Sequence, residues 1–346
     1  MKTYQISFFD ESKRLAALSR LGDPLEQLLK YVDFEIFRPI LNEAFRKADR
    51  KSPAGRKPLD VILMFKAMVI QRLFNLSDEQ LEFQITDRTS FTRFLGLHTS
   101  ETIPDYTSFW GFRESLMEKG LDRMLFDQFS AKLEAEGIYA KSGSIIDATI
   151  VEVPKQRNSR EENVQIKSGK VPVDWDEDKS CHKDTDARWL KKNGVSFFGY
   201  KDHIKTDAGT SLITDYRVTP ASTHDSVVLK ELVSEADGGK PLYADSAYTG
   251  EEIERILKGL NIKNKTCEKG RRGAPLTEAQ RQHNRQKSKI RALVEHVFGF
   301  MENSMNGIFL RCIGIKRATC QIGLANLTYN ICRYVQLIRL NRVKLA

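Results

Sequence analysis

Three short stretches, far apart in the chain, each place one acidic residue where a strand or a helix can aim it at a common point. These are Asp147 within residues 144–149, Asp245 within residues 241–248 and Glu295 within residues 290–296. Carboxylate oxygens suit hard cations such as magnesium or manganese. Two such ions about 3.5–4 Å apart can hold the attacking and leaving oxygens of a phosphodiester displacement. The two aspartates on apolar strands and the glutamate on a later helix therefore predict a site for two Mg²⁺ or Mn²⁺ ions.

The charge of the chain is compatible with a polyanionic substrate. Lysine and arginine number 55 against 46 acidic residues, which gives a net charge of +9 and a pI near 9.2. Residues 261–292 hold ten Lys/Arg against Glu268 and Glu278, and residues 310–346 hold seven with no acid. An excess of this size fits a nucleic acid without requiring one.

The five cysteines are scattered and show no CxxC spacing. A disulfide framework and a zinc module are therefore not expected, and a reducing cytoplasm is the better interpretation. The N-terminus has no apolar signal region, and the longest apolar run, Val61–Ile70, contains Lys66 and is too short to cross a bilayer. We expect no membrane partner.

Residues 1–136 are predicted to form an all-helical N-terminal domain. Apolar residues recur at helical spacing between Leu25 and Ile36, and a second helix is expected over Leu59–Phe74. Ser77 with Gln80 forms a capping box, and further helices are expected at 90–95, 105–115 and 120–137. A DNA-reading helix-turn-helix and a plain helical bundle fit the pattern equally well. The candidates for phosphate contact in this segment are Arg56, Lys57, Arg88, Arg93 and Arg113.

Residues 137–346 show a different pattern, which predicts an α/β domain with a mixed sheet flanked by helices. Strands are expected at 144–151, 196–205, 211–218, 241–244 and 262–265, and helices at 225–234, 249–258 and 288–301. A polar stretch at about 155–195 is either a functional insertion or a partly disordered loop. The three acids fall on the first strand, the end of the fourth and the last helix.

Five motifs in order make the chain resemble bacterial insertion-sequence transposases of the DDE type, in the family named for insertion sequence five. Residues 57–130, with the stretch Pro104–Phe109, are similar to its N-terminal helical domain. The other four are residues 186–203, 220–225, 244–248 and 291–299. The resemblance covers nearly the whole chain.

The resemblance implies a ribonuclease H-like core in which Asp147, Asp245 and Glu295 are catalytic and hold two Mg²⁺ or Mn²⁺ ions. It implies double-stranded DNA as the partner, both transposon ends and target. A homodimer on DNA is expected because two ends must be brought together. A bacterial protein of this kind would lie in the cytoplasm with the nucleoid.

A related insertion-sequence signature has Tyr, Arg, Glu and Lys at positions that correspond here to Ser288, Arg291, Glu295 and Glu302. Arginine and glutamate match, whereas tyrosine and lysine do not. Arg291 also lies one helical turn before Glu295, so an ordinary helical ion pair accounts for this spacing as well.

The candidate DNA contacts each have a simpler structural alternative. Lys201 and His203 alternate on a strand and are expected to face solvent, and His224 follows a strand, where it can serve a turn. Trp189 can stack on a base or anchor local packing. The basic run before Glu295 can contact the DNA backbone or be a solvated surface. The full set of expected DNA contacts is Arg188, Trp189, Lys201, His203, His224, Arg285, Lys287, Lys289 and Arg291.

These patterns together predict a metal-dependent DNA transposase that cuts and rejoins DNA at the inverted ends of its own element. Two other functions remain open at this point. One is a ribonuclease H-like nuclease or resolvase without strand transfer. The other is a transposase-derived DNA-binding protein without catalysis, although DNA binding alone does not call for buried acids.

Overall fold

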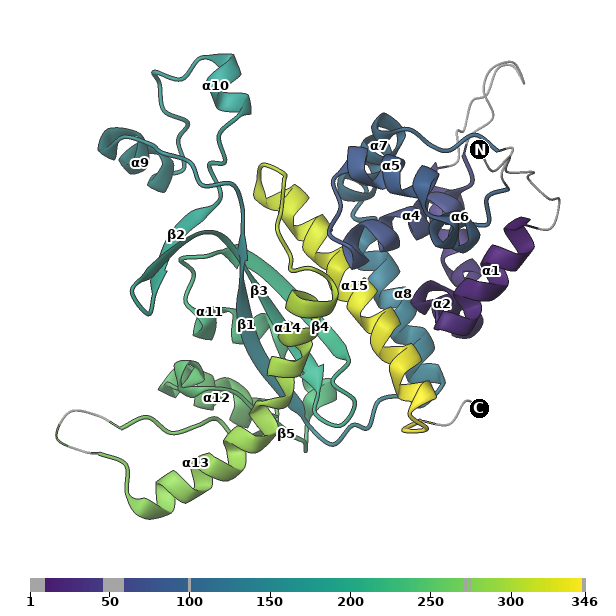
Figure 1. The fold of residues 1–346 in the computed structure, drawn as a ribbon. Coiled ribbons are helices and arrows are strands. Elements are labelled where there is room, and N and C mark those ends of the chain that lie inside the picture. Colours follow the sequence, from purple (N-terminus) through teal and green to yellow (C-terminus); the bar gives the residue numbers. More distant parts are fainter. Residues whose placement is uncertain (1–9, 46–58, 99–100, 271–272, 274, 344–346) are drawn as a thin grey trace.

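The computed structural model describes residues 10–45, 59–98, 101–270, 273 and 275–343. Helices gather at the two ends of the chain and a mixed sheet lies between them (Figure 1). This agrees with the expected α/β class and with an N-terminal helical segment. Arg56 and Lys57 lie outside the described residues.

The N-terminal segment consists of short helices joined by tight turns. The capping box predicted at Ser77 is present, and Asp105 caps α7, where a helix was expected over 105–115. The expected continuous pattern from Leu25 to Ile36 is interrupted, because the Asp33 side chain accepts a hydrogen bond from the backbone of Glu35 and starts a separate 3-10 turn. The helices are α1 Asp10–Leu21, α2 Pro24–Tyr31, η1 Phe34–Phe37, α3 Arg38–Phe45, α4 Val61–Leu73, α5 Asp78–Asp87, α6 Thr89–Leu95, α7 Tyr106–Glu118 and α8 Leu121–Ala135.

The sheet combines antiparallel and parallel pairs. Strand β1 pairs with β3 in the antiparallel direction along its whole length and with β5 in parallel. Strand β3 also pairs with β2 and with β4, both antiparallel, and β5 pairs in parallel with β6. The path is β2-β3-β1-β5-β6, with β4 attached to β3. The strands are β1 Ser144–Glu152, β2 Arg188–Lys192, β3 Val195–Asp207, β4 Ile213–Pro220, β5 Pro241–Tyr243 and β6 Lys263–Asn264.

The helices of the second half cover both faces of this sheet. Residues Ile146 and Leu242 pack with α11 and α12, whereas Ile145 and Ile204 pack with α14, α15 and the N-terminal helices. The helices and 3-10 turns are α9 Arg160–Lys167, α10 Glu177–Cys181, α11 Asp225–Leu232, η2 Glu235–Asp237, η3 Ser246–Tyr248, α12 Glu251–Gly259, α13 Glu278–Arg291, α14 Leu293–Ser304 and α15 Ile315–Arg339.

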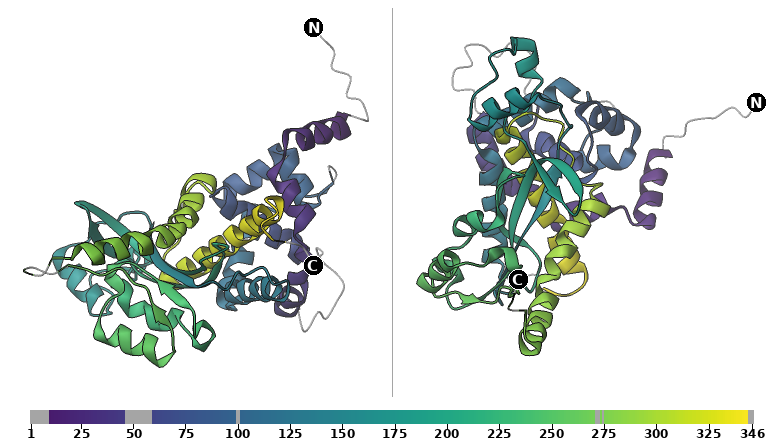
Figure 2. Two further views of the ribbon diagram at one scale, coloured as in Figure 1. Left: turned by 90° about the horizontal axis from the view of Figure 1, so that it is seen from below. Right: turned by 90° about the vertical axis from the view of Figure 1, so that its left-hand side faces the viewer.

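The polar stretch at 155–195 contains two short helices and an edge strand that the sequence pattern did not predict. Trp175 is buried and donates from its indole nitrogen to Glu162, and Asp184 accepts hydrogen bonds from the Tyr200 hydroxyl and the backbone of Gly314. This insertion and α13 project from opposite ends of the sheet (Figures 1 and 2).

Helix α15 connects the two halves of the molecule. It packs against α4 and α8 on one side and against β4 on the other, and nearly its whole circumference is buried. The basic C-terminal stretch is therefore largely a core helix. The division into domains 1–136 and 137–346 stays a prediction, with α15 shared between the N-terminal helices and the sheet.

Buried polar groups fix α15 against the sheet. Asn330 exchanges two hydrogen bonds of 2.8 Å with the backbone of Ile213, as a neighbouring strand would. Asn326 donates to Asp202. The remaining carboxyl oxygen of Asp202 and the amide oxygen of Asn326 are both buried and have no partner in the part of the chain that the structure describes. Burial raises the pKa of Asp202 to about 7. A protonated Asp202 can donate the second hydrogen bond, which satisfies both oxygens.

This pair predicts a stability that falls with rising pH. The pKa of Asp202 is raised above its unfolded value of about 3.9. The stabilisation is therefore complete below about pH 4 and is lost as pH rises to about 7, by roughly 1.4 kcal/mol for each unit between the two values. In Asp202→Asn the amide pair with Asn326 is neutral at every pH, so this part of the slope disappears. Denaturant unfolding at a series of pH values measures the difference.

Asp87→Asn is the control, because it removes a carboxylate from an exposed position at the end of α5. It should keep the wild-type slope. A wild-type slope in Asp202→Asn as well would show that Asp202 is ionised in the folded protein.

Candidate active site

The strands bring the two predicted aspartates together. Asp147 lies in the middle of β1, and Asp245 follows β5, which pairs in parallel with β1. Burial raises the pKa of Asp147, and the negative charge of Asp245 raises it further. Ile145 lies opposite Tyr243 in the parallel register, and Asp147 and Asp245 each follow two residues later, which places their carboxylates close enough to repel each other.

Arg291 connects the third acid to the first. Its guanidinium donates to Asp147 Oδ2 and to Glu295 Oε1, each at 2.8 Å. The ion pair with Glu295 is the helical i,i+4 pair expected from the sequence, whereas the bond to Asp147 spans 144 positions in the chain. No pattern in the sequence predicted this second contact.

The expected single helix over 288–301 is wrong in its bounds. It begins at Glu278 and is interrupted at Ala292, so that α13 ends at Arg291 and α14 begins at Leu293 (Figure 1). A cation at the C-terminal end of one helix and Glu295 in the first turn of the next are each stabilised by the helix dipole. The break therefore places Arg291 beside Asp147 and Glu295 within reach of Arg291.

Backbone groups orient the aspartates. Asp147 Oδ1 accepts from the N–H of Ala148, and Asp245 Oδ1 accepts from the N–H of Ala247 and caps the 3-10 turn η3. This interaction caps the turn that follows β5. It leaves Oδ2 of Asp245 without a hydrogen bond to any other described residue and available to a ligand.

A buried tyrosine below the acids was not assigned any role from the sequence. Tyr248 is almost fully buried, and its hydroxyl has no hydrogen-bond partner within the described ranges. Burial raises its pKa, and the carboxylates of Asp225, Asp147 and Asp245 raise it further, in that order. Its place at the end of the motif 244–248 was the available signal.

The donor set fits hard divalent cations, because all three side chains offer carboxylate oxygens. The arrangement is not a closed cluster, since the described part of the chain contains no group of three or more His, Cys, Asp or Glu close enough to hold an ion. Glu295 accounts for this, as its side chain is 60% exposed and turned to Arg291. Asp147 and Asp245 form the assembled part of the site.

The prediction that two candidate DNA contacts on β3 face solvent is wrong. Lys201 and His203 are buried and face α11, where Lys201 donates to Asp225 Oδ1 at 2.7 Å. The imidazole of His203 contacts the Thr219 hydroxyl, and burial lowers its pKa to about 4, so it is neutral. The alternation that suggested a solvent-facing side reflects a face covered by a helix.

Further candidates have structural partners of their own. Arg188 donates to the backbone carbonyls of Thr185 and Ala187, and His224 caps α11 through the backbone of Ser226. Trp189 is partly exposed and packs against Phe198 with ring centroids 5.1 Å apart.

In the N-terminal helices, the three described candidates are also engaged. Arg93 pairs with Asp23, Arg113 pairs with Asp78, and Arg88 lies over the ring of Phe91. None of these three contacts requires DNA.

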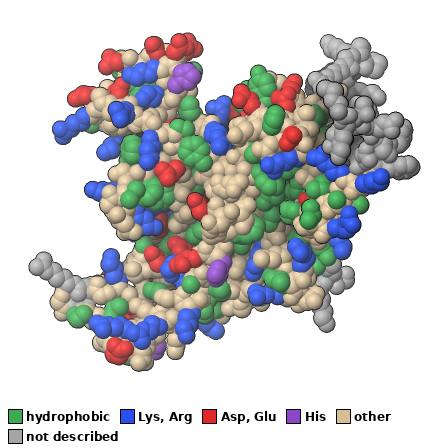
Figure 3. Space-filling model, viewed as in Figure 1, with side chains coloured by type: hydrophobic (Ala, Val, Ile, Leu, Met, Phe, Trp, Pro, Cys, Tyr) green, Lys and Arg blue, Asp and Glu red, His purple; other side chains and the backbone are tan. Residues whose placement is uncertain are grey.

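Helix α13 carries the basic surface. Arg285 and Lys289 are exposed, and Lys287 donates to the Thr266 carbonyl and to Glu268. Figure 3 shows Lys and Arg side chains gathered along the lower left edge, over α13. Within the described residues, no side chain of α13 is buried.

Two protein families match the chain in consecutive regions. Residues 138–331 match the family described as Transposase DDE domain, and residues 13–115 match the one described as Transposase domain (DUF772). The first match spans more than half of the chain and includes all three acids. The chain therefore belongs to the DDE transposase family.

A curated relative agrees with this assignment. The chain is similar to the transposase for insertion sequence element IS1106 of Neisseria meningitidis serogroup B, with 31% identity over 229 residues that cover 64% of this chain and 76% of that protein.

In the described ranges, no helix has the length and apolarity that crossing a membrane would need.

Two solved structures show weaker likeness. The piggyBac transposase synaptic complex with hairpin DNA is similar at a TM-score of 0.43 and 12% identity, covering 94% of this chain and 77% of that one. The pre-cleavage Mos1 transpososome is similar at a TM-score of 0.19 and 9% identity, covering 99% and 100%. Both TM-scores are below 0.5, so neither likeness bears on the fold of this chain.

The bridge through Arg291 predicts an unequal effect of two substitutions on stability. Arg291→Gln removes the charged partner of the half-buried Asp147 and should lower the free energy of unfolding by roughly 1.5–3 kcal/mol. Glu295→Gln removes only an exposed ion pair and should change it by less than about 0.5 kcal/mol. Denaturant unfolding without divalent metal compares them.

Arg281→Gln is the matched control, since Arg281 lies on the same helix in an exposed pair with Glu278. It should behave like Glu295→Gln. Equal stability of Arg291→Gln and Arg281→Gln would contradict the bond to Asp147.

Proposed function

We propose that this chain is a transposase of the insertion sequence five family that binds the inverted ends of its element and catalyses metal-dependent strand cleavage and strand transfer. The core is proposed to be ribonuclease H-like. Its sheet order supports this, with three antiparallel strands, β4, β3 and β1, followed by the parallel strands β5 and β6. The catalytic acids are Asp147, Asp245 and Glu295.

One observation carries the proposal: Asp147 and Asp245 converge from neighbouring parallel strands, and Arg291 ties Glu295 to the same point. All of these residues lie in the region that matches the transposase DDE domain. A purely structural ion pair would explain Arg291 and Glu295. It would not explain why two carboxylates are placed where they repel each other.

Asp147, Asp245 and Glu295 are the residues that would hold two Mg²⁺ or Mn²⁺ ions. When bound, such ions supply the positive charge that activates the attacking oxygen and stabilises the leaving oxygen of the phosphodiester. The chain itself orients the acids through the N–H groups of Ala148 and Ala247. Arg291 compensates the charge of Asp147 and Glu295 and offers a guanidinium to a phosphate beside them.

DNA is proposed to run along α13 towards the acids. Arg285 and Lys289 project from this helix into solvent, and Arg291 stands at its end. Double-stranded DNA from the element ends and from the target would use this surface. A homodimer on DNA would bring two ends together.

The metal-ligand assignment predicts that Asp147→Asn, Asp245→Asn and Glu295→Gln each abolish end cleavage in magnesium while leaving the protein folded. The loss should exceed about a hundredfold, the upper end of what it costs to substitute a residue that only hydrogen-bonds to a metal ligand. Cleavage of a duplex that carries the inverted repeat measures this, and pre-cut ends test strand transfer separately.

Glu302→Gln is the control, because Glu302 is an exposed glutamate on the same helix as Glu295. It should cut at the wild-type rate. Wild-type cleavage by any one of the three acid variants would remove that residue from the site, and cleavage without strand transfer would favour a nuclease.

The DNA path predicts that Arg285→Ala and Lys289→Ala each weaken binding and reduce the salt slope by about 0.9 per lost phosphate contact. Lys287→Ala should have a smaller effect, because Lys287 already donates to Thr266 and Glu268. Binding at several salt concentrations without divalent metal provides the slopes. Unchanged slopes for both exposed positions would exclude this path.

A further inference from the structure

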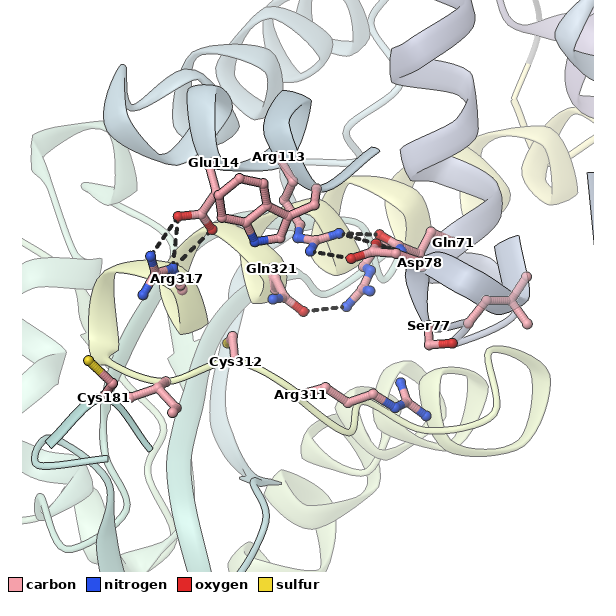
Figure 4. A pocket seen from close by; sticks show the side chains of 14 residues that line it. Gln71, Ser77, Asp78, Arg113, Glu114, Cys181, Arg311, Cys312, Arg317 and Gln321 are labelled. Atoms are coloured by element: carbon pink, nitrogen blue, oxygen red, sulfur yellow. Dashed lines mark hydrogen bonds and ion pairs between the residues drawn. The ribbon is translucent and has the colours of Figure 1, made fainter. Parts of the chain in front are cut away.

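A second basic site lies far from the three acids, between the N-terminal helices and the start of α15. It is a cavity of about 300 Å³ lined by α4, α5, α7, the segment before α15 and Cys181 of the insertion (Figure 4). Trp110 and Arg311 border it and are exposed, so the cavity is open to solvent. This volume is at the lower end of ligand-binding pockets.

Four guanidinium groups line this cavity against two carboxylates. Arg113 makes bonds to both oxygens of Asp78, and Arg317 pairs with Glu114 at 2.7 Å. Figure 4 shows both pairs on one side of the cavity and Arg311 on the other. The charges cancel within each of these two pairs, so the positive charges of Arg72 and Arg311 remain.

Arg72 is buried without an acidic partner among the described residues. Its Nη1 donates to Gln321 Oε1 at 3.0 Å, and its buried Nε has no hydrogen-bond partner in the described ranges. Burial lowers its pKa to about 10, and the positive charge of Arg113 lowers it further. The carboxylate of Asp78 raises the pKa of Arg72 in part but forms no ion pair with it. A buried cation without an ion-pair partner destabilises a fold, so such a group indicates a ligand that supplies the charge.

Arg311 is the second uncompensated cation. It contacts the backbone and side-chain oxygens of Asn75 at 3.4 and 3.3 Å, which are long for hydrogen bonds to a guanidinium, and it lies over the ring of Phe309. Its exposed position leaves donors available. Arginine donors form a planar fork that matches two phosphate oxygens.

We propose that this cavity, with Arg72 and Arg311 as its unpaired cations, binds a backbone phosphate of DNA. DNA is favoured over a small free anion because the chain belongs to a DNA transposase family and because the cavity opens beside Trp110, whose exposed ring can pack against a sugar of the DNA backbone. This site goes beyond the cleavage reaction proposed above and uses none of its acids.

Arg311→Gln tests the site through its exposed member. Binding of a mixed-sequence DNA duplex, measured without divalent metal, should weaken about tenfold and lose about 0.9 from the salt slope. The matched control is Arg339→Gln, which removes the same charge from an exposed position at the far end of α15. Equal affinities and slopes for the two variants would overturn the proposal.

Arg72→Met separates a binding role from a structural one. Since Arg72 is an unpaired buried cation, the free protein should unfold at the same or a higher temperature, while DNA affinity falls. A lower unfolding temperature with unchanged DNA affinity would show that Arg72 serves the fold alone and would overturn the proposal.

Inorganic phosphate distinguishes the source of the anion. If phosphate raises the unfolding temperature relative to chloride at equal ionic strength, Arg311→Gln should remove this temperature shift and also weaken DNA binding as described above. A phosphate shift that Arg311→Gln removes without changing DNA affinity would assign the cavity to a small anion instead. Because binding is measured without metal, none of these outcomes depends on Asp147, Asp245 or Glu295.

Discussion

The structure depends on a helix that is buried on nearly all sides. Helix α15 lies between the N-terminal helices and the sheet, so its polar side chains must find partners on both. Tyr334 donates to Glu136 at the end of α8 on one side, and Asn330 pairs with the backbone of Ile213 on the other. Hydrophobic packing alone would tolerate a rotation of α15. These directional bonds allow one register and thereby set the position of the helices relative to β4.

The three acids are held in position to different degrees. Asp147 is on β1, which is paired with β3 along its whole length and with β5 at its first two residues, and Asp245 follows β5. Glu295 lies instead on α14 and is exposed, and its link to the aspartates is a single guanidinium. The two aspartates are therefore positioned by the sheet, whereas the glutamate is positioned by electrostatics and by the break at Ala292.

Features with a local cause could be predicted from the sequence. The cap at Ser77 and the placement of Asp147 on an apolar strand both depend on neighbouring residues. Helix α15 was missed because its apolar residues surround the axis and leave no stripe. The burial of Lys201 was missed because its partner, Asp225, is 24 positions away. Short-range patterns contain no information about such pairings.

Helix α13 has no buried side chain within the described residues, so little of its stability comes from the core. Its last residue is Arg291, which holds Asp147 and Glu295. A partner that binds α13 and restricts its motion therefore also affects the geometry of the acids, because Arg291 is part of this helix. By thermodynamic linkage, a change at the acids alters the affinity of α13 for that partner by the same factor. The affinity of α13 for its partner and the arrangement of the three acids therefore depend on the same conformational equilibrium.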